Sequence, residues 1–539
     1  MSALQETILL DPPVQEHLSI SSLETWLWDA ACVIRGATDA PKFKDFILPL
    51  IFFKRLADVF DDEFEEQVET FGGTDIAREV IQEDHDSSLR DGHTPILRFY
   101  IPEDCSWRAI RNHAADGTLG EFLTEALRTV ARLNPELQGV LDVKDYAERQ
   151  SGQRALDDQR LGALIEIISR HRLGLKNTKP DVLGDAYEYL LRKFAEGQGQ
   201  SAGEFFTPTE VGLLTGELLD PPPFSSLYDP TCGSAGLLVK ARMAYERKHP
   251  DQRSQAPRLY GQELNAVTFA MAKMNVFLHD YSGAEFAIGD TFRHPGFGAA
   301  GAGLQTFDRV VANPMWNQKN YVESFYEADA WHRFGHGIPP NSSADWAWVQ
   351  HIWASLKSGG RAAVVLDTGA VSRGSGSEGS NKERVIRKAF VEMDAIEGVV
   401  LLPENLFYNT SAPGIILLLR KDKPEAQRGQ VLLVNASAFF VKEKPKNVLT
   451  SAGIAAVVKA FRDWEPREKL SRIVTLEEVW ATDYNLSPSQ FVEVGERVTH
   501  RPLSEIVRAL VDAKVERDRA DEHLASVLAR LDLATEVSA

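Results

Sequence analysis

The chain has 539 residues, and its 59 Lys and Arg against 78 Asp and Glu give a net charge of −19. With 43% hydrophobic and 9% aromatic residues, the composition is typical of a globular protein with about three to four folding units. No apolar stretch approaches the roughly 18 residues that span a bilayer, and the N-terminus shows no signal-peptide pattern. We therefore expect a cytoplasmic protein with no membrane partner. The acidic balance argues against a protein that binds nucleic acid unaided.

The three cysteines, Cys32, Cys105 and Cys232, lie far apart in the sequence. They show no metal-ligand spacing, and three cysteines are too few for a disulfide framework. We expect neither a zinc site nor disulfides, which fits a reducing compartment.

Residues 1–175 are expected to form a helical domain. Trp, Leu, Ile and Phe recur there at helical spacing, as at Leu23, Trp26 and Leu27, and strand signals are few. Within this region, residues 83–94 are polar and acidic, which predicts a loop.

From residue 176 to about 425, short apolar runs alternate with helical patterns, which is typical of a mostly parallel sheet covered by helices. This pattern predicts an α/β domain with a doubly wound sheet. Its expected strands are Ser226–Tyr228, Arg258–Gly261, Glu285–Ile288, Arg309–Val311, Arg361–Leu366, Ala395–Leu401 and Gly414–Leu419. A Gly- and Ser-rich segment at 369–381 predicts a mobile loop near the edge where such folds bind ligands.

The C-terminal part of the chain divides into two regions. Residues 426–495 carry mixed and weaker signals, whereas residues 496–539 have apolar side chains at helical spacing, beginning with Leu503, Ile506 and Leu510. This stripe predicts an amphipathic helix. Such a helix can pack on its own domain or bind a partner, and the sequence leaves both alternatives open.

A Gly-rich turn, residues 229–236, follows the first expected strand of the sheet and precedes an expected helix at 237–248. Glycines at such a junction let the backbone turn tightly beside a ligand, and the start of a helix offers free N–H groups. The turn lacks the full G-x-G-x-x-G spacing, so a purely structural turn is the alternative. Its candidate cofactor-binding residues are Asp229, Gly233, Ser234, Ala235 and Gly236.

Acidic residues follow the next two expected strands. Glu263 follows the second strand, where a carboxylate of this fold can accept hydrogen bonds from both hydroxyls of a ribose. Asp290 follows the third strand, where a carboxylate can accept from an adenine amino group. Either acid alone would more often be a solvated surface charge, but ligand-competent turns after three successive strands favour a nucleoside-bearing cofactor.

An aromatic segment, residues 203–208, lies upstream of the expected sheet. Its structural interpretation is a helix N-terminus, with Thr207 as the cap and Pro208 in the first turn. The same helix end can present N–H groups to a carboxylate of the cofactor while the Phe side chains wall off the pocket. The candidate cofactor-binding residues here are Glu204, Phe205, Phe206, Thr207, Pro208 and Thr209.

The candidate catalytic residues are the tetrad Asn313, Pro314, Met315 and Trp316, which follows the fourth expected strand. If the Asn313 side-chain oxygen and the Pro314 carbonyl accept the two hydrogens of an exocyclic amino group, the nitrogen lone pair points at an electrophilic methyl. Trp316 can stack on a base that has left the duplex. An Asn-Pro pair is usually only a turn, but its position after the cofactor turns favours catalysis, and no metal is required.

These motifs resemble those of the modification subunits of type I restriction-modification systems, which are S-adenosylmethionine-dependent adenine DNA methyltransferases. The resemblance rests on the tetrad, the Gly-rich turn, residues 203–208 and residues 261–265. It extends to residues 23–56 in the helical domain and to residues 483–488 near the C-terminus. Nearly the whole chain is therefore covered.

The resemblance implies a Rossmann-like methyltransferase domain with S-adenosyl-L-methionine as cofactor. It places cofactor contacts at residues 204–209, at residues 234–236 and at Glu263, and an adenine-facing acid at Asp290. It also implies partners: double-stranded DNA, a specificity subunit that reads the sequence, a second copy of the modification subunit and a motor endonuclease subunit. Reliance on these partners would account for the acidic charge.

The chain departs from the family pattern at two positions. Met315 stands where the tetrad usually has a second Pro, so both acceptors and the ring survive but a fixed backbone angle is lost. Glu204 stands where Gln is common. The alternative functions are methyl transfer to cytosine or to a protein glutamine, and a catalytically silent scaffold that binds cofactor and DNA within a defence complex. The chain length and the large helical domain disfavour a protein substrate.

Overall fold

The computed structural model describes residues 20–34, 43–115, 117–150, 153–177, 184, 186–190, 192, 207–281, 283–299, 303–319, 321–377, 381–408, 410–493 and 503–530. The chain divides into two compact units, Met1–Val492 and Glu493–Ala539, and each is described by itself. Within the described ranges, no helix is long and apolar enough to cross a membrane.

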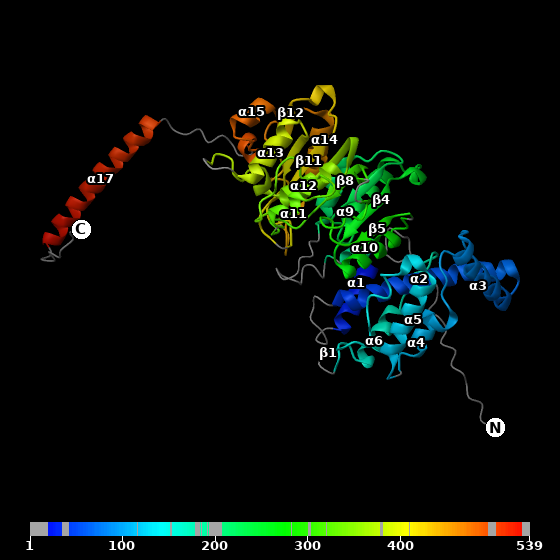
Figure 1. The fold of residues 1–539 in the computed structure, drawn as a ribbon. Coiled ribbons are helices and arrows are strands. Elements are labelled where there is room, and N and C mark those ends of the chain that lie inside the picture. Colours follow the sequence, from blue (N-terminus) through cyan, green and yellow to red (C-terminus); the bar gives the residue numbers. More distant parts are fainter. Residues whose placement is uncertain are drawn as a thin grey trace. The chain divides into compact units, whose positions relative to one another are not determined.

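Helices build the N-terminal part of the first unit, coloured blue to cyan in Figure 1. They are α1 Ile20–Val33, α2 Phe43–Phe71, α3 Thr74–Asp91, α4 Trp107–Asn112, α5 Leu119–Leu133 and α6 Asp158–Ile168, with short 3-10 turns η2 Glu103–Cys105 and η3 Pro135–Leu137 and a hairpin of β1 Arg149–Gln150 and β2 Gln153–Arg154. In α5, Leu119, Leu123, Leu127 and Val130 are buried, because their spacing of three to four residues places them on one helix face. The expected helical domain is confirmed.

The loop expected at residues 83–94 is wrong for most of its length, because α3 continues to Asp91 and ends at Gly92 in the left-handed conformation. The buried face of α3 carries His85 and Ser88 beside its few apolar side chains. The His85 Nε2 atom lies 2.9 Å from the carbonyl oxygen of Leu133. A helix face buried through polar groups leaves little hydrophobic periodicity in the sequence.

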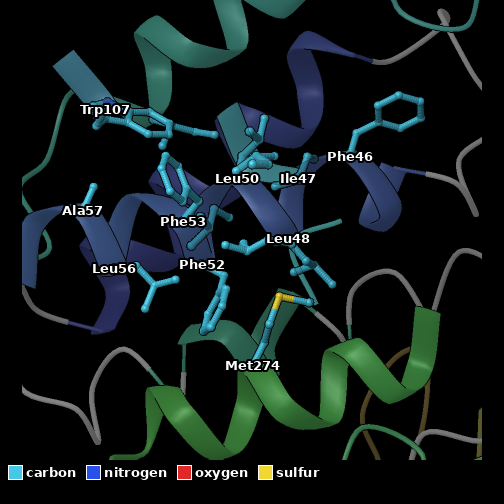
Figure 2. Packing of buried hydrophobic residues seen from close by; sticks show 14 of the residues in the cluster. Phe46, Ile47, Leu48, Leu50, Phe52, Phe53, Leu56, Ala57, Trp107 and Met274 are labelled. Carbon is cyan, nitrogen blue, oxygen red and sulfur yellow. The ribbon is translucent and has the colours of Figure 1, made fainter. Parts of the chain in front are cut away.

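The helical core extends into α10 (Ala266–Leu278), a helix of the α/β part of the unit. Figure 2 shows Met274 from α10 beside Phe52 of α2. On another face of α10, Ala272 and Val276 join the core beneath the sheet. Because α10 contributes to both cores, it links the helical domain to the sheet.

The central sheet has nine strands in the order β15-β12-β10-β11-β9-β8-β3-β4-β5. Strands β5, β4, β3, β8 and β9 run parallel, and β11 is antiparallel to both of its neighbours. The strands are β3 Ser226–Asp229, β4 Arg258–Glu263, β5 Glu285–Ile288, β8 Phe307–Ala312, β9 Leu356–Asp367, β10 Ile396–Leu401, β11 Gly414–Arg420, β12 Gln430–Asn435 and β15 Ser471–Thr475. All seven predicted strands are present, and the predicted α/β fold is confirmed.

Both faces of the sheet are covered by helices. In β9, Ala363 and Val365 face the core formed with α8 (Thr209–Leu219), α9 (Gly236–Lys248) and α14 (Ser451–Asp463). Alternate residues such as Val364 face the core formed with α12 (Asp345–Ala354) and α13 (Lys382–Glu392). Strands buried on both faces are apolar throughout, which explains why short apolar runs located them.

Residues 426–492 are continuous with the sheet, because β12 pairs with β10 and β15 pairs with β12. The second unit contains α17 (Leu503–Arg530), and Leu510 and Leu524 on it are 71% and 57% exposed. The amphipathic helix expected beyond residue 496 is therefore present. The remaining elements are α11 Glu323–Glu327, α15 Leu476–Ala481, α16 Pro488–Phe491, β6 Gly298–Ala299, β7 Gly303–Leu304, β13 Phe440–Val441, β14 Val448–Leu449, η5 Arg253–Gln255, η6 Thr368–Val371 and η7 Glu425–Gln427.

The segment expected as a mobile loop is held in place over residues 369–377. Arg373 forms ion pairs with Asp367 at 2.9 Å and Glu383 at 2.6 Å, and it also pairs with Asp345. The Arg387 side chain donates to the Arg373 carbonyl oxygen at 3.0 Å. The Gly and Ser content predicted mobility, but these ion pairs are specific side-chain contacts that composition does not reveal.

Candidate functional site

Two predicted motifs lie at the carboxyl ends of neighbouring strands. β3 and β8 pair in parallel, with Tyr228 opposite Val310; β3 leads into the Gly-rich turn and β8 into the tetrad. From β3 the chain adds β4 and β5 on one side and then β8 and β9 on the other. Open α/β sheets bind ligands where the strand order reverses in this way.

The Gly-rich turn is braced from within by Asp229. Its Oδ1 atom accepts the backbone N–H of Thr231 at 2.9 Å, and burial raises the pKa of this carboxyl to about 7. Gly233 and Ala235 have φ of 54° and 63°, so the chain reverses tightly before α9. Among the described residues no side chain caps α9, and its first N–H groups are therefore suited to a ligand.

Hydrogen bonds join the turns that follow β3, β4 and β5. The backbone N–H of Gly233 donates to Glu263 Oε2 at 3.1 Å. The Thr291 hydroxyl, next to Asp290, donates to the Pro230 carbonyl oxygen at 2.7 Å. The three predicted cofactor turns are thus one connected structure at one edge of the sheet.

The two predicted acids each carry local hydrogen bonds. Glu263 Oε1 accepts the backbone N–H of Asn265 at 2.8 Å, so this carboxylate braces both its own turn and the Gly-rich turn. Asp290 Oδ1 accepts the backbone N–H of Phe292 at 2.9 Å, and its Oδ2 accepts the Tyr321 hydroxyl. A ligand donor reaching Asp290 Oδ2 would share that oxygen with Tyr321.

The upstream segment reaches the tetrad through Thr207. Helix α8 begins at Thr209 with Pro208 at the N-cap position, and no side chain in the described part of the chain caps it. The expected capping by Thr207 is wrong, because its hydroxyl oxygen accepts a hydrogen bond from Asn313 Nδ2 at 2.8 Å. Three predicted cofactor-binding residues lie outside the described part of the chain: Glu204, Phe205 and Phe206.

The Asn313 side chain is held at both ends. Its Oδ1 atom accepts from the Trp316 indole N–H at 3.2 Å, and the same N–H lies 3.2 Å from the Val365 carbonyl oxygen. An indole nitrogen can only donate, so this contact assigns the amide oxygen and leaves the nitrogen facing Thr207. The orientation of the predicted acceptor atom is therefore fixed by its neighbours.

The Trp316 ring is half-buried and meets the Phe407 ring edge-on, with 4.7 Å between the centroids. A Cβ atom on Gly414 would lie 2.9 Å from the Trp316 ring, so the sheet approaches the ring closely. Pro314 is buried and Met315 is half-buried. Stacking of Trp316 on a base stays a prediction.

A cavity opens at this edge of the sheet, where open α/β sheets bind their ligands. The predicted residues that line it are Thr207, Pro208, Thr209, Asp229, Gly233, Ser234, Gly236 and Asn313. The predicted residues beside it that do not line it are Ala235, Glu263, Asp290, Pro314, Met315 and Trp316. The cavity brings the Gly-rich turn and the first tetrad residue to one space.

Among the cavity residues that the sequence interpretation missed, the polar ones from outside the predicted motifs are Glu188, Lys240 and Asn275. Lys240 Nζ lies 2.6 Å from Glu188 Oε2, and both side chains are buried. Asn275 Nδ2 donates to the Ser234 carbonyl oxygen at 2.9 Å. The sequence did hold one signal, because Lys240 interrupts an otherwise apolar run, 237–241.

Comparison with known proteins places the chain in a family. A family model described as N-6 DNA Methylase matches residues 178–499, and one described as HsdM N-terminal domain matches residues 23–168. The methylase subunit of the type I restriction enzyme MjaVIII from Methanocaldococcus jannaschii is 32% identical over 512 residues, which cover 92% of this chain and 82% of that relative. The chain belongs to the type I restriction-modification methylases.

Solved structures share the fold of this methylase. The type I restriction-modification system methyltransferase subunit from Streptococcus thermophilus matches with a TM-score of 0.73 at 28% identity, over 88% of this chain and 100% of that one. A structure from a study of type I R-M system assembly matches with a TM-score of 0.58 at 20% identity, over 94% of this chain and 98% of that one.

The methylase uses S-adenosylmethionine as its cofactor, and the site fits this molecule. The uncapped start of α9 suits the carboxylate of the cofactor's amino-acid end. Glu263, the last residue of β4, stands where this fold binds ribose hydroxyls. When bound there, the cofactor supplies an electrophilic methyl group.

Proposed function

We propose that this methylase transfers a methyl group to the exocyclic amino group of an adenine flipped out of double-stranded DNA. The observation that carries the proposal is the Asn313 amide, which lies at the cofactor cavity with its oxygen assigned by Trp316 and its nitrogen engaged by Thr207. A fixed amide acceptor beside a methyl-donor site suits an amino-group substrate.

The acceptor atoms needed for this chemistry are present. A carbonyl oxygen has two lone pairs, so Asn313 Oδ1 can accept one amino hydrogen while it accepts from Trp316. The backbone carbonyl of Pro314 can accept the second hydrogen. These two acceptors draw the amino nitrogen toward tetrahedral geometry and expose its lone pair. As the new C–N bond forms, the methyl–sulfur bond of the cofactor would break to leave S-adenosylhomocysteine, and the amino nitrogen would release one proton to water.

The same proposal includes the partners. With a net charge of −19, the chain needs help to hold DNA, because phosphate binding depends on basic surfaces. We propose a cytoplasmic complex with a specificity subunit, a second modification subunit and a motor endonuclease subunit, in which α17 contacts a partner. The exposed apolar residues of α17 support that contact.

The decisive experiment is co-expression with the cognate specificity subunit, followed by mass spectrometry and sequencing of modified bases. We expect N6-methyladenine at a defined sequence with the wild type and none with Asn313→Ala. Binding of S-adenosylmethionine by calorimetry serves as the control that Asn313→Ala is folded. Methylcytosine in place of methyladenine would refute the substrate, and cofactor binding without methylation by the wild type would favour a silent scaffold.

A further inference from the structure

Two residues that line the cofactor cavity each carry a buried side-chain oxygen that has no hydrogen-bond partner in the part of the chain that the structure describes. These oxygens are Glu188 Oε1 and Asn275 Oδ1, and the two residues are 7% and 0% exposed. Buried polar atoms in native proteins are nearly always hydrogen-bonded, so an unpaired acceptor in a cavity wall indicates a missing donor. Two such acceptors on residues that line one cavity suit a ligand group with several donors.

The rest of each side chain is already anchored. Glu188, from the helical residues 186–190, pairs through Oε2 with Lys240 Nζ at 2.6 Å. Asn275 donates through Nδ2 to the Ser234 carbonyl oxygen at 2.9 Å, and turning the amide over would set two oxygens against each other. These contacts hold each side chain in place, so the unpaired oxygen cannot rotate toward another partner.

An ammonium group matches these acceptors, because it has three donors, no acceptor and a positive charge. The amino-acid end of S-adenosylmethionine carries an α-ammonium and a carboxylate. The carboxylate suits the start of α9, which lies in the same cavity as the acceptors. We propose that Glu188 and Asn275 bind the α-ammonium of the cofactor, with Lys240 positioning the Glu188 carboxylate.

This assignment rests on S-adenosylmethionine as cofactor and not on which base is methylated. The competing interpretation is that Glu188 and Lys240 form an ion pair that only packs the helical residues 186–190 against α9. A packing role would change the affinity for every ligand of the cavity alike. A role in ammonium binding changes the affinity only for ligands that carry the ammonium.

The test is calorimetry on the full chain with S-adenosylhomocysteine and with its analogue that lacks the α-amino group. We expect the wild type to bind S-adenosylhomocysteine at least tenfold more tightly than the analogue. Glu188→Gln preserves shape but removes the charge, so we expect it to reduce this preference to about threefold or less. The matched control is Glu217→Gln, since Glu217 pairs with Lys248 at 3.0 Å and does not line the cavity.

The outcomes separate the alternatives. A Glu188→Gln protein that loses affinity for both ligands equally, or that keeps the full preference, overturns the proposal. If the variant fails to fold, the wild type still decides, because equal affinity for the two ligands excludes an ammonium site. If the wild type binds neither ligand, both the assignment of the ammonium site and S-adenosylmethionine as the cofactor are overturned. A failure to methylate adenine leaves the binding comparison intact, so the two proposals fail separately.

Discussion

The indole N–H of Trp316 donates a hydrogen bond to the Asn313 side-chain oxygen across 3.2 Å. The tetrad therefore holds its own catalytic candidate in place, since the residue expected to stack on the base also orients the amide. Thr207 completes this arrangement by accepting from the amide nitrogen at 2.8 Å. An acceptor fixed before the substrate arrives needs no reorganisation during the reaction.

Replacing Trp316 by Phe keeps an aromatic ring but removes the N–H donor. We expect kcat to fall by about three- to tenfold, since one neutral hydrogen bond contributes ~0.5–1.5 kcal/mol, while the affinity for cofactor stays unchanged. Methyl-transfer kinetics with the specificity subunit measure the first quantity, and calorimetry measures the second. Trp480→Phe is the control, because Trp480 is 64% exposed; equal kcat values for the two variants would contradict the orienting role.

Replacing Glu263 by Ala tests the ribose contact. We expect the affinity for S-adenosylmethionine to fall by ~1.5–3 kcal/mol, as for loss of a charged hydrogen-bond partner. Binding of 5′-methylthioadenosine, which keeps the ribose but has no amino-acid end, should weaken as well. The Glu188→Gln variant should bind 5′-methylthioadenosine with wild-type affinity. The two variants therefore distinguish binding of the ribose from binding of the amino-acid end of the cofactor. Unchanged affinity in a folded Glu263→Ala protein would refute the assignment.

The positions of the strands and of the main site motifs could be predicted from the sequence. Residues 362–366 of β9 and 415–419 of β11 are buried on both faces and are therefore apolar, which marks them without a structure. The Gly-rich turn, Asp290 and the tetrad follow parallel strands of the sheet, and Glu263 ends another, so their meeting at one sheet edge follows from parallel topology.

The features of the site that could not be predicted depend on pairwise side-chain contacts, which leave no periodic signal in the sequence. The Glu188–Lys240 pair and the Asn275 contact with Ser234 join residues far apart in the chain. The orientation of the Asn313 side-chain amide could not be predicted either. The sequence pattern indicated that Thr207 caps a helix, whereas its hydroxyl accepts a hydrogen bond from the Asn313 amide nitrogen. Local rules assign such polar residues to caps or surfaces, and only the fold shows what they contact.

Replacing Arg373 by Met should destabilise the protein by about 3–5 kcal/mol, because removing one partner leaves buried charges unpaired. The Asp345 and Glu383 side chains that pair with Arg373 are 0% and 4% exposed. Chemical unfolding of wild type and variant at pH 7 measures the difference. Arg373→Lys keeps the charge but not all of the contacts, so its loss should be intermediate. A variant as stable as the wild type would show that the ion pairs do not hold residues 369–377.

Truncation after His500 removes α17 and tests its role in assembly. We expect the truncated chain to lose co-purification with the specificity subunit, because the exposed apolar residues of α17, including Leu510 and Leu524, are no longer available to a partner. The affinity for S-adenosylmethionine should stay unchanged, because the cavity residues all lie in the first unit. Leu510→Asp in the full chain is the finer variant. Co-purification of both altered chains at normal yield would count against the contact.

Replacing Asp229 by Asn should make stability less dependent on pH. Burial raises the pKa of this carboxyl from 3.8 to about 7, although hydrogen bonds from Thr231 oppose the shift. Between pH 4 and 7 the folded chain therefore holds a proton that the unfolded chain has released. The free energy of unfolding then falls as pH rises, by at most about 1.4 kcal/mol per pH unit.

Asn at position 229 carries no proton to lose, so we expect the stability advantage of Asp229→Asn over the wild type to grow from pH 5 to pH 7 and to level off above pH 8. Urea unfolding of both proteins at pH 5, 6, 7 and 8 without cofactor gives this difference directly. A difference that is constant over the four pH values would mean that Asp229 is ionised throughout. In that case the burial of this carboxylate in the Gly-rich turn is compensated by its neighbours.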